Sequence, residues 1–466
     1  MSLLDRLEQL KQRLSTRPQF KRPQSQRAPS RDPYVFQIGF DFGTSYSKCV
    51  IRDRDKAFVF SFDLQGKTEF LLSSSILYRD GFFSTNTANQ LYPEHGLWYI
   101  KMALVELAHR NFSAPVLERF NKAAGAAPGS IKLQNFVLSA ALFYLSRALG
   151  KIRSFILMRY PDYGKHERDD MFVTMAIPVS NMADRETETL FLRLLKKAWA
   201  MACTDSPMAE SASWKEMASL IAKPAPALRE CKVYPEVSAN IQVFLHSPAS
   251  PGRTTNIYLV TDIGAGTVDQ CCFTFYNRDR EEDKLNYLSA QVFDLGSSVI
   301  DQLCARDYGH DVEYWRKQKE NGSEDKHLHR VLDHVSLVLS NNFVAVSLKE
   351  LTDHLYRGNG LSPDNTVCRL CYILFSGGGD MDHPYHTAVL NGLRRKMGLP
   401  IREVMDGSYT EQWESRIINV QKPGDLELPK GCESWMKRLL VAYGLSFYDL
   451  PGNRFPDETA IVQNRG

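Results

Sequence analysis

The sequence lacks the features that mark several specialised classes of protein. Its 57 basic and 54 acidic residues nearly cancel to a net charge of +3, too little to indicate a nucleic-acid or membrane surface. No apolar run approaches the roughly 20 residues that span a bilayer. The N-terminal sequence MSLLDRLEQLKQRL carries charges throughout and has no signal-peptide core. We therefore expect a cytoplasmic protein with no membrane contact.

Cysteine is too sparse to form a disulfide framework, with nine cysteines among 466 residues. The CxxC motif from Cys368 to Cys371 has no second cysteine pair or spaced histidines to complete a four-ligand zinc site. We interpret these cysteines as core residues of a reduced protein.

The chain is long enough for at least two domains, and its first 33 residues differ from the rest. Leu3, Leu7, Leu10 and Leu14 form a short heptad stripe, followed by a segment rich in Pro, Ser, Gln and Arg. We interpret residues 1–33 as a short helix plus a disordered basic linker. The helix is either a docking element for a protein partner or a frayed terminus.

From residue 34 onward, strand-like and helix-like segments alternate, which is typical of α/β architecture. A second series of strands starts at TNIYLVTDIGAGTVDQCCFTFY and indicates two related lobes with a cleft between them. The predicted domains are lobe I (34–240), lobe II (241–431), a connecting helix back to lobe I (432–450) and a C-terminal tail (451–466).

The stretch QIGFDFGTSYSKCVI predicts a β-hairpin with a polar turn. Asp41 ends the first strand, and Gly43 can adopt a positive φ, so that backbone N–H groups can turn towards an anion. Thr44, Ser45 and Ser47 add hydroxyl donors, and Asp41 could hold a hydrated Mg²⁺. Taken alone, this is equally an ordinary Gly-Thr-Ser hairpin.

The second lobe repeats the pattern. In IYLVTDIGAGTVDQCCFTF, Asp262 ends a strand and is followed by Gly264, Gly266 and Thr267. Two such hairpins facing each other across a cleft could grip a polyphosphate, and their carboxylates, Asp41 and Asp262, could share one hydrated Mg²⁺.

Two further segments are rich in small residues. A buried strand leads into Ser376, the glycines 377–379 and Asp380, where close approach of another group, plausibly a nucleoside, is expected. The segment LLVAYGLSF predicts a helix in which Ala442 and Gly444 permit tight helix packing at a hinge.

These four elements, in this order, resemble the ATPase fold shared by actin, the seventy-kilodalton heat-shock chaperones and the sugar kinases, over about residues 34–450. The chaperone branch is most similar, through FDFGTSYSKCVI and VFDLGSSVIDQLC. The resemblance implies a two-lobed actin-like fold of duplicated ribonuclease-H-like domains, with ATP or ADP and Mg²⁺ in a central cleft. It also makes Lys101, in LWYIKMALVELA, the counterpart of the catalytic lysine.

The catalytic residues implied are Asp41, Lys101, Glu236, Asp262 and Thr267, with Asp41 and Asp262 holding the metal through water. The residues implied to bind the nucleotide are Gly43, Thr44, Ser45, Tyr46, Gly264, Ala265, Gly266, Gly296, Asp333, Ser340, Gly377, Gly378, Gly379, Asp380 and Met381.

The sequence departs from the chaperone pattern in three places. Tyr234 stands where the catalytic glutamate is expected, and Glu236 resembles the arrangement of filament-forming bacterial actins, where it could orient the attacking water. In the base clamp, Ser336, Leu337 and Met381 replace basic residues, so adenine is the default base. About twenty residues follow the last predicted helix, and we expect no peptide-binding domain of the chaperone type.

The sequence therefore favours a chaperone-like, slow ATPase that acts as a nucleotide-driven conformational switch for a protein partner. The alternatives are an actin-like ATPase that self-assembles into filaments and a pseudo-ATPase that binds nucleotide as a scaffold. A small-molecule kinase would need a catalytic Asp base deep in the cleft, and no segment supplies one.

Overall fold

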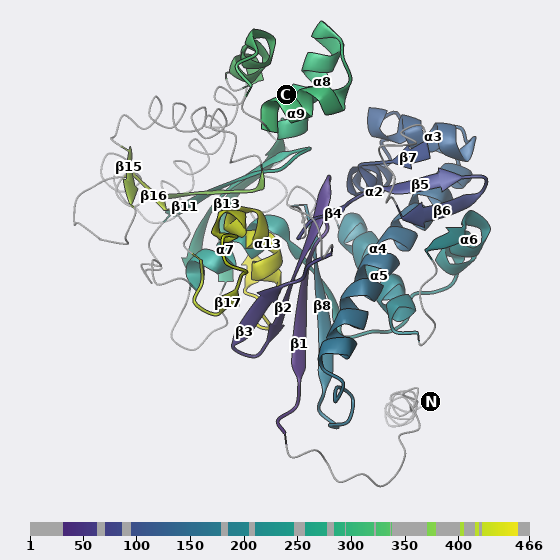
Figure 1. The fold of residues 1–466 in the computed structure, drawn as a ribbon, viewed down its shortest axis with the longest axis vertical. Coiled ribbons are helices and arrows are strands. Elements are labelled where there is room, and N and C mark those ends of the chain that lie inside the picture. Colours follow the sequence, from purple (N-terminus) through teal and green to yellow (C-terminus); the bar gives the residue numbers. More distant parts are fainter. Residues whose placement is uncertain are drawn as a thin grey trace, which may run out of the picture.

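The computed structural model describes residues 31–62, 70–85, 95–178, 185–204, 210–246, 257–276, 284–293, 295–320, 323–335, 337, 371–378, 401–404, 415–418 and 422–454. Within them, helices and strands alternate as expected, and the fold is mixed α/β with several sheets (Figure 1). The predicted N-terminal helix lies outside the described residues. Arg31, near the end of the predicted linker, forms an ion pair of 2.6 Å with Asp169.

The first large sheet is built around a strand that is buried along nearly its whole length, Val35–Asp41. Its next two strands run antiparallel to one another, and two later strands add in parallel on the other side. In order across the sheet, the strands are β10 (Cys231–Pro235), β8 (Asp170–Ile177), β1 (Val35–Asp41), β2 (Tyr46–Asp53), β3 (Lys56–Val59) and β17 (Leu426–Glu427), and β4 (Leu72–Ser73) also pairs with β2.

The second large sheet confirms that a new series of strands begins in the TNIYLVTDIGAGTVDQCCFTFY segment. In order, its strands are β15 (Ile401–Val404), β16 (Ser415–Ile418), β14 (Cys371–Ser376), β11 (Ile257–Ile263), β12 (Val268–Tyr276), β13 (Lys284–Phe293) and β18 (Gly452–Arg454). Its centre repeats the first sheet: three antiparallel strands in chain order, with later strands added in parallel beside the first of them.

The helices beside the first sheet enclose the largest core of the described residues. Helix α4 (Ile131–Arg159) starts where the Ser130 side chain accepts a hydrogen bond from the N–H of Leu133. Helix α5 (Arg185–Ala202) has Glu186 and Glu188 in its first turn, where acidic residues complement the helix dipole. The other elements here are η2 (Pro115–Leu117), helices α2 (Ile100–Ala108), α3 (Glu118–Ala124) and α6 (Trp214–Ala222), and a small sheet in the order β7 (Gly96–Leu97), β5 (Ile76–Arg79), β6 (Phe82–Thr85) and β9 (Ser211–Ser213).

Two helices, α7 (Glu236–Leu245) and α13 (Met436–Leu445), lie between the two large sheets (Figure 1). A Cβ atom on Gly444 would overlap the carbonyl of Ala239 in α7, and one on Gly39 of β1 would overlap the carbonyl of Ala442. The tight packing predicted for Ala442 and Gly444 is therefore confirmed. The short helix η5 (Glu433–Trp435) precedes α13, and helices α8 (Ser297–Tyr308) and α9 (Val312–Glu320) share a hydrophobic core with the second sheet.

The chain crosses between the two sheets at places other than the predicted boundaries. Strand β17 already pairs with β3 of the first sheet before residue 432. Residues 452–454, predicted as part of a tail, form β18 and pair with β13 of the second sheet. Both shifts have the same cause: short segments satisfy their backbone hydrogen bonds at a sheet edge, and such pairing leaves little trace in a sequence.

Candidate functional site

The turns of the two polar hairpins lie against each other. A Cβ atom on Gly266, in the β11–β12 turn, would lie 3.1 Å from Cγ2 of Thr44 in the β1–β2 turn and 2.9 Å from the sulfur of Met102 in α2. At these residues the two turns therefore face each other directly. A side chain at position 266 would press on both the other hairpin and α2.

In the first hairpin, the Asp41 carboxylate is buried and accepts a hydrogen bond of 2.6 Å from Nζ of Lys48. The two residues are directly opposite in the β1–β2 register. Gly43 does not adopt the positive φ that a glycine allows at this position. Glycine is required here for a different reason, because a Cβ atom would overlap the carbonyl oxygen of Tyr46.

The Ser47 hydroxyl was predicted to face an anion, but the residue is buried between β2 and helix α4. It lies 3.0 Å from the Ser74 hydroxyl and accepts a 2.8 Å hydrogen bond from the hydroxyl of Tyr144. The N–H of Ser74 also donates to the carbonyl of Ser45. Successive side chains of a strand point to opposite faces, so the Ser47 side chain points away from those of Tyr46 and Lys48. Its contacts with Ser74 and Tyr144 therefore hold the hairpin in place.

In the second hairpin, the Gly264 N–H donates to the carbonyl of Thr267 at 2.9 Å. The start of α8 packs onto this turn: the N–H groups of Gly296, Ser297 and Ser298 donate to the carbonyls of Gly266, Gly264 and Ala265 at 2.8–3.2 Å. A Cβ atom on Gly296 would overlap the turn backbone. The structure thus brings the predicted residues Gly264, Ala265, Gly266 and Gly296 together.

Lys101 and Glu236 form an ion pair beside the hairpins. Lys101 is in the first turn of α2 and is only 4% exposed, so it is not the surface lysine that a helix of this composition would ordinarily carry. Glu236 is the first residue of α7, where the helix dipole favours a carboxylate. Tyr234 is buried, and its hydroxyl donates to the carbonyl of Pro451 at 2.9 Å. This hydroxyl therefore has a structural role.

The charged groups of the site act on one another electrostatically. Burial lowers the pKa of Lys101 to about 8, although the nearby carboxylates of Asp41, Asp269 and Asp262 favour its charged form. Burial also raises the pKa of Asp262, and the Asp41 carboxylate adds to this effect. The 2.8 Å hydrogen bond from the Asn240 amide to Asp262 opposes it.

Gly377 has a φ of +92°, and a Cβ atom there would overlap the Asp262 carboxylate and the carbonyl of Ile263. Strand β14 runs parallel to β11 with Ser376 opposite Asp262. The close approach expected at these glycines is therefore made, at Gly377, by the second hairpin. Gly378 would place a Cβ atom 3.8 Å from Nε of Arg438 in α13.

Some predicted residues are not brought into this cluster. Asp333 is exposed on the helical residues 326–335, and no described contact joins it to either hairpin. Leu337, in the altered base clamp, is 54% exposed. Ser340, Gly379, Asp380 and Met381 lie outside the described residues.

Three site residues were missed by sequence reasoning: Lys48, Asn240 and Asp269. Asp269 is buried and lies opposite Asp262 in the β11–β12 register, just as Lys48 lies opposite Asp41. The antiparallel register could have revealed Lys48 and Asp269, because the residue opposite each aspartate is seven positions further along the chain. Asn240 follows Glu236 by one helical turn.

Among the described residues, no group of three or more His, Cys, Asp and Glu side chains is arranged to hold a metal ion directly. In the same part of the chain, no helix combines the length and the apolar character that a bilayer crossing needs. The chain matches no protein-family model and no curated protein. Functional inference therefore rests on the geometry of the site.

Proposed function

We propose that this chain is a Mg-ATP-binding ATPase of the actin and heat-shock chaperone type, which works as a nucleotide-driven conformational switch for a protein partner. The observation that carries the proposal is the buried Lys101–Glu236 ion pair beside two facing, aspartate-bearing hairpins. A buried lysine among several carboxylates is costly to desolvate, and such groups are concentrated at functional sites.

The arrangement of the sheets supports a two-lobed actin-like fold. Both large sheets place their polar hairpin at the same point of the same strand order. Helices α7 and α13 pack tightly between the sheets through Gly444 and Ala239. In this proposal, lobe I contains the first sheet, lobe II contains the second, and the two helices form the hinge.

The residues of the site divide into three roles. Backbone N–H groups and the Thr44 and Thr267 hydroxyls would bind the phosphates between the turns. Asp41, Asp262 and Asp269 would hold a hydrated Mg²⁺ through its water ligands, and this ion neutralises phosphate charge when it is bound. The fit of the metal rests on the buried Asp262 carboxylate. The nearby Asp41 carboxylate disfavours its ionised form, and a bound cation would favour that form.

Lys101 and Glu236 would act on the hydrolysis itself. The Lys101 ammonium group would stabilise negative charge on the γ-phosphate, and the Glu236 carboxylate would orient the attacking water. In the described structure these two groups neutralise each other. A γ-phosphate that attracts Lys101 would therefore release Glu236 to bind water, which ties the water-orienting group to the presence of ATP.

The same geometry favours turnover over a pseudo-ATPase scaffold. The loss of a glutamate at position 234 motivated the scaffold alternative, but Glu236 supplies a carboxylate that contacts Lys101. The switch is proposed because the first hairpin meets the second half of the chain through adjustable contacts, which include Thr44 beside Gly266 and Tyr46 with Arg316 of α9. A nucleotide that binds both turns would add to this small set and shift the lobes.

The test is ATP turnover to ADP and phosphate with Mg²⁺, measured beside nucleotide binding by calorimetry. Asp262→Ala and Glu236→Ala are compared with the wild type and with Glu188→Gln, an exposed carboxylate of α5 that serves as the matched control. We expect the wild type and the control to turn over, both site variants to lose turnover, and Glu236→Ala to keep binding.

Two outcomes would change the proposal. Nucleotide binding without wild-type turnover would make the protein a nucleotide-gated scaffold. No binding at all would reject the assignment of the facing hairpins to a polyphosphate. Sedimentation with and without ATP separates the switch from a filament-forming ATPase. A filament-forming ATPase should pellet when ATP is present, whereas a switch should stay in the supernatant.

A further inference from the structure

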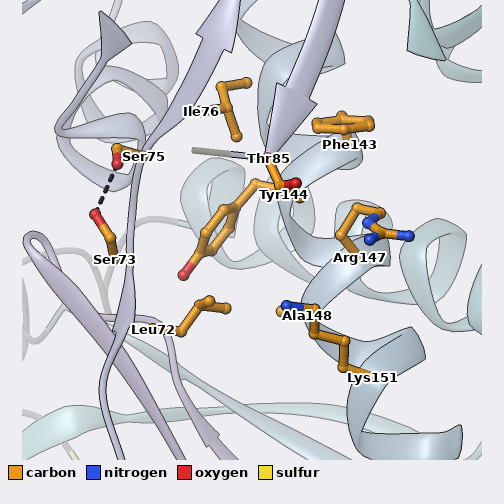
Figure 2. Close-up of a pocket in the computed structure, with 10 residues that line it drawn as sticks. All are labelled: Leu72, Ser73, Ser75, Ile76, Thr85, Phe143, Tyr144, Arg147, Ala148 and Lys151. Atoms are coloured by element: carbon orange, nitrogen blue, oxygen red, sulfur yellow. Dashed lines mark hydrogen bonds between the residues drawn. The ribbon is translucent and has the colours of Figure 1, made fainter. Parts of the chain in front are cut away.

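A second candidate site lies within the first half of the chain. A cavity of about 100 Å³ opens between helix α4 and the segment that includes strands β4, β5 and β6 (Figure 2). Most of its wall is apolar and comes from Leu72, Ile76, Phe143 and the ring of Tyr144. A cavity of this size and lining suits a ligand with a small apolar body.

One side of the cavity is cationic. Arg147 and Lys151 are one helical turn apart on α4, and both line the cavity on the side facing away from Ser73 and Ser75 in Figure 2. Burial lowers the pKa of Arg147, and the Glu210 carboxylate opposes this effect. Lys151 is exposed and has no ion-pair partner in the described part of the chain. These three groups sum to one positive charge beside the apolar wall.

The opposite side of the cavity is connected to the first hairpin. Ser73 and Ser75 line the cavity, and their hydroxyls are 2.7 Å apart. Ser74, between them, points the other way: its hydroxyl lies 3.0 Å from that of Ser47, and its N–H donates to the Ser45 carbonyl. Tyr144 belongs to both environments, with its ring in the cavity wall and its hydroxyl bonded to Ser47.

We propose that this cavity binds a small monocarboxylate with an apolar body of a few carbon atoms, and that its occupancy is transmitted to the first hairpin through residues 73–75 and Tyr144. The carboxylate would lie between Arg147 and Lys151, and the apolar body would contact Leu72, Ile76 and Phe143. A charge-assisted hydrogen bond to each cation gives the head group its specificity. Binding and transmission are both tested without nucleotide, so this proposal does not depend on the proposed function.

The binding test uses butyrate as the probe, without nucleotide, on the full chain. Butyramide has the same shape without the charge, and inorganic phosphate has the charge without the apolar body. By ligand-observed NMR titration, we expect saturable butyrate binding and at least about tenfold weaker binding of both comparison compounds. In Lys151→Gln and Arg147→Gln, butyrate affinity should fall about tenfold or more, while Lys122→Gln on α3 should match the wild type.

Lys151 is exposed, so its substitution should not impair folding and keeps the test decisive even where Arg147→Gln is unstable. Absence of saturable butyrate binding, equal binding of butyramide or phosphate, or an equal loss in Lys122→Gln would each overturn the proposal.

The transmission test uses hydrogen–deuterium exchange at residues 44–47, again without nucleotide. Saturating butyrate should slow exchange there in the wild type, and Ser74→Ala should bind butyrate but show less than half of that response. An unchanged response in Ser74→Ala, or no response in the wild type, would overturn the proposed connection. Because no measurement here contains ATP, its result is separate from that of the ATPase test.

Discussion

The two hairpins of the site have the same backbone plan but differ in charge. In each, an aspartate lies at or next to the end of the first strand, a glycine follows two residues later, and the residue directly opposite the aspartate is seven positions further along. That opposite residue is Lys48 beside Asp41 and Asp269 beside Asp262. The first hairpin is therefore neutral within itself, whereas the second carries two buried carboxylates.

This difference shows that the second hairpin depends on charges from other elements. Asp262 accepts a hydrogen bond from the neutral amide of Asn240 in α7, and the positive charges of Lys48 in the first hairpin and of Lys101 in α2 favour its ionised form. Lys101 also interacts electrostatically with Asp269. A hydrated Mg²⁺ would add to this compensation. We therefore expect substitutions at matched positions of the two hairpins to have unequal effects.

The largest expected difference is between Asp269→Asn and Lys48→Gln. Asp269→Asn removes a carboxylate proposed to hold the hydrated metal, and we expect kcat/KM for Mg-ATP to fall about 10–100-fold. Lys48→Gln leaves Asp41 available to the metal and should change kcat/KM by less than about tenfold. Steady-state kinetics across a Mg²⁺ titration measures both. Equal losses in the two variants would contradict the charge asymmetry.

The next comparison concerns the matched glycines. A Cβ atom on Gly43 would overlap the Tyr46 carbonyl, whereas one on Gly264 would lie 3.1 Å from the Thr267 carbonyl. Gly43→Ala should destabilise the fold by about 1–3 kcal/mol, because the backbone must move to accept the methyl group. Gly264→Ala should cost less. The two midpoints of urea unfolding decide the matter, and a larger loss in Gly264→Ala would refute this order.

The third prediction concerns pH. Lys101 has a pKa of about 8 instead of its ordinary 10.5, so its proposed role requires the protonated form that is lost as pH rises through 8. We expect kcat/KM to fall up to tenfold per pH unit above this value. Lys101→Arg, whose guanidinium stays protonated, should be slower but nearly independent of pH over 7–10. A wild-type profile that is flat over this range would exclude the role.

The lowered pKa of Lys101 also predicts a change of stability with pH. Between about 8 and 10.5, the unfolded chain binds a proton at Lys101 that the folded chain does not. The contribution of Lys101 to the free energy of unfolding therefore rises with pH across that window. The difference between the wild type and Lys101→Met, measured by urea unfolding at pH 7.5 and 10, should change in that direction.

The smallest expected effect tests a contact between the first hairpin and α9. The Arg316 guanidinium donates to the Tyr46 hydroxyl at 2.5 Å and lies 5.1 Å from the centre of its ring. Tyr46→Phe removes the hydrogen bond and keeps the ring, so we expect a change in nucleotide affinity of up to about tenfold. Calorimetric binding beside Tyr448→Phe, an exposed tyrosine, provides the control.

Much of the fold could be predicted from the sequence, because it depends on local patterns. The alternation of strand-like and helix-like segments predicted the α/β architecture, and the second series of strands predicted the second large sheet. The two hairpins were found through Asp41 and Asp262 with their glycines. Gly43 does not use the positive φ that its sequence allows, and contact with the Tyr46 carbonyl imposes glycine there instead.

Other parts of the site depended on partners distant in the sequence. Ser47 was predicted to face a ligand, but its hydroxyl is bonded to Tyr144, which comes from α4. Asp269 and Lys48 were not assigned because a single strand does not reveal which residue will lie opposite. Strand β18 was taken for a tail, because a three-residue pairing at a sheet edge has no clear sequence signal.

The sequence by itself determined the two polar turns, the strands that carry them and the small residues at which backbones come close. These follow from side-chain size, alternation and conformational freedom along a few consecutive residues. Only the tertiary structure decided that Lys101 is buried, that Glu236 contacts it in place of Tyr234, and that one hairpin is neutral while the other is acidic. Charge pairing and burial arise between residues far apart in the chain, so they exist only once the sheets and helices have packed.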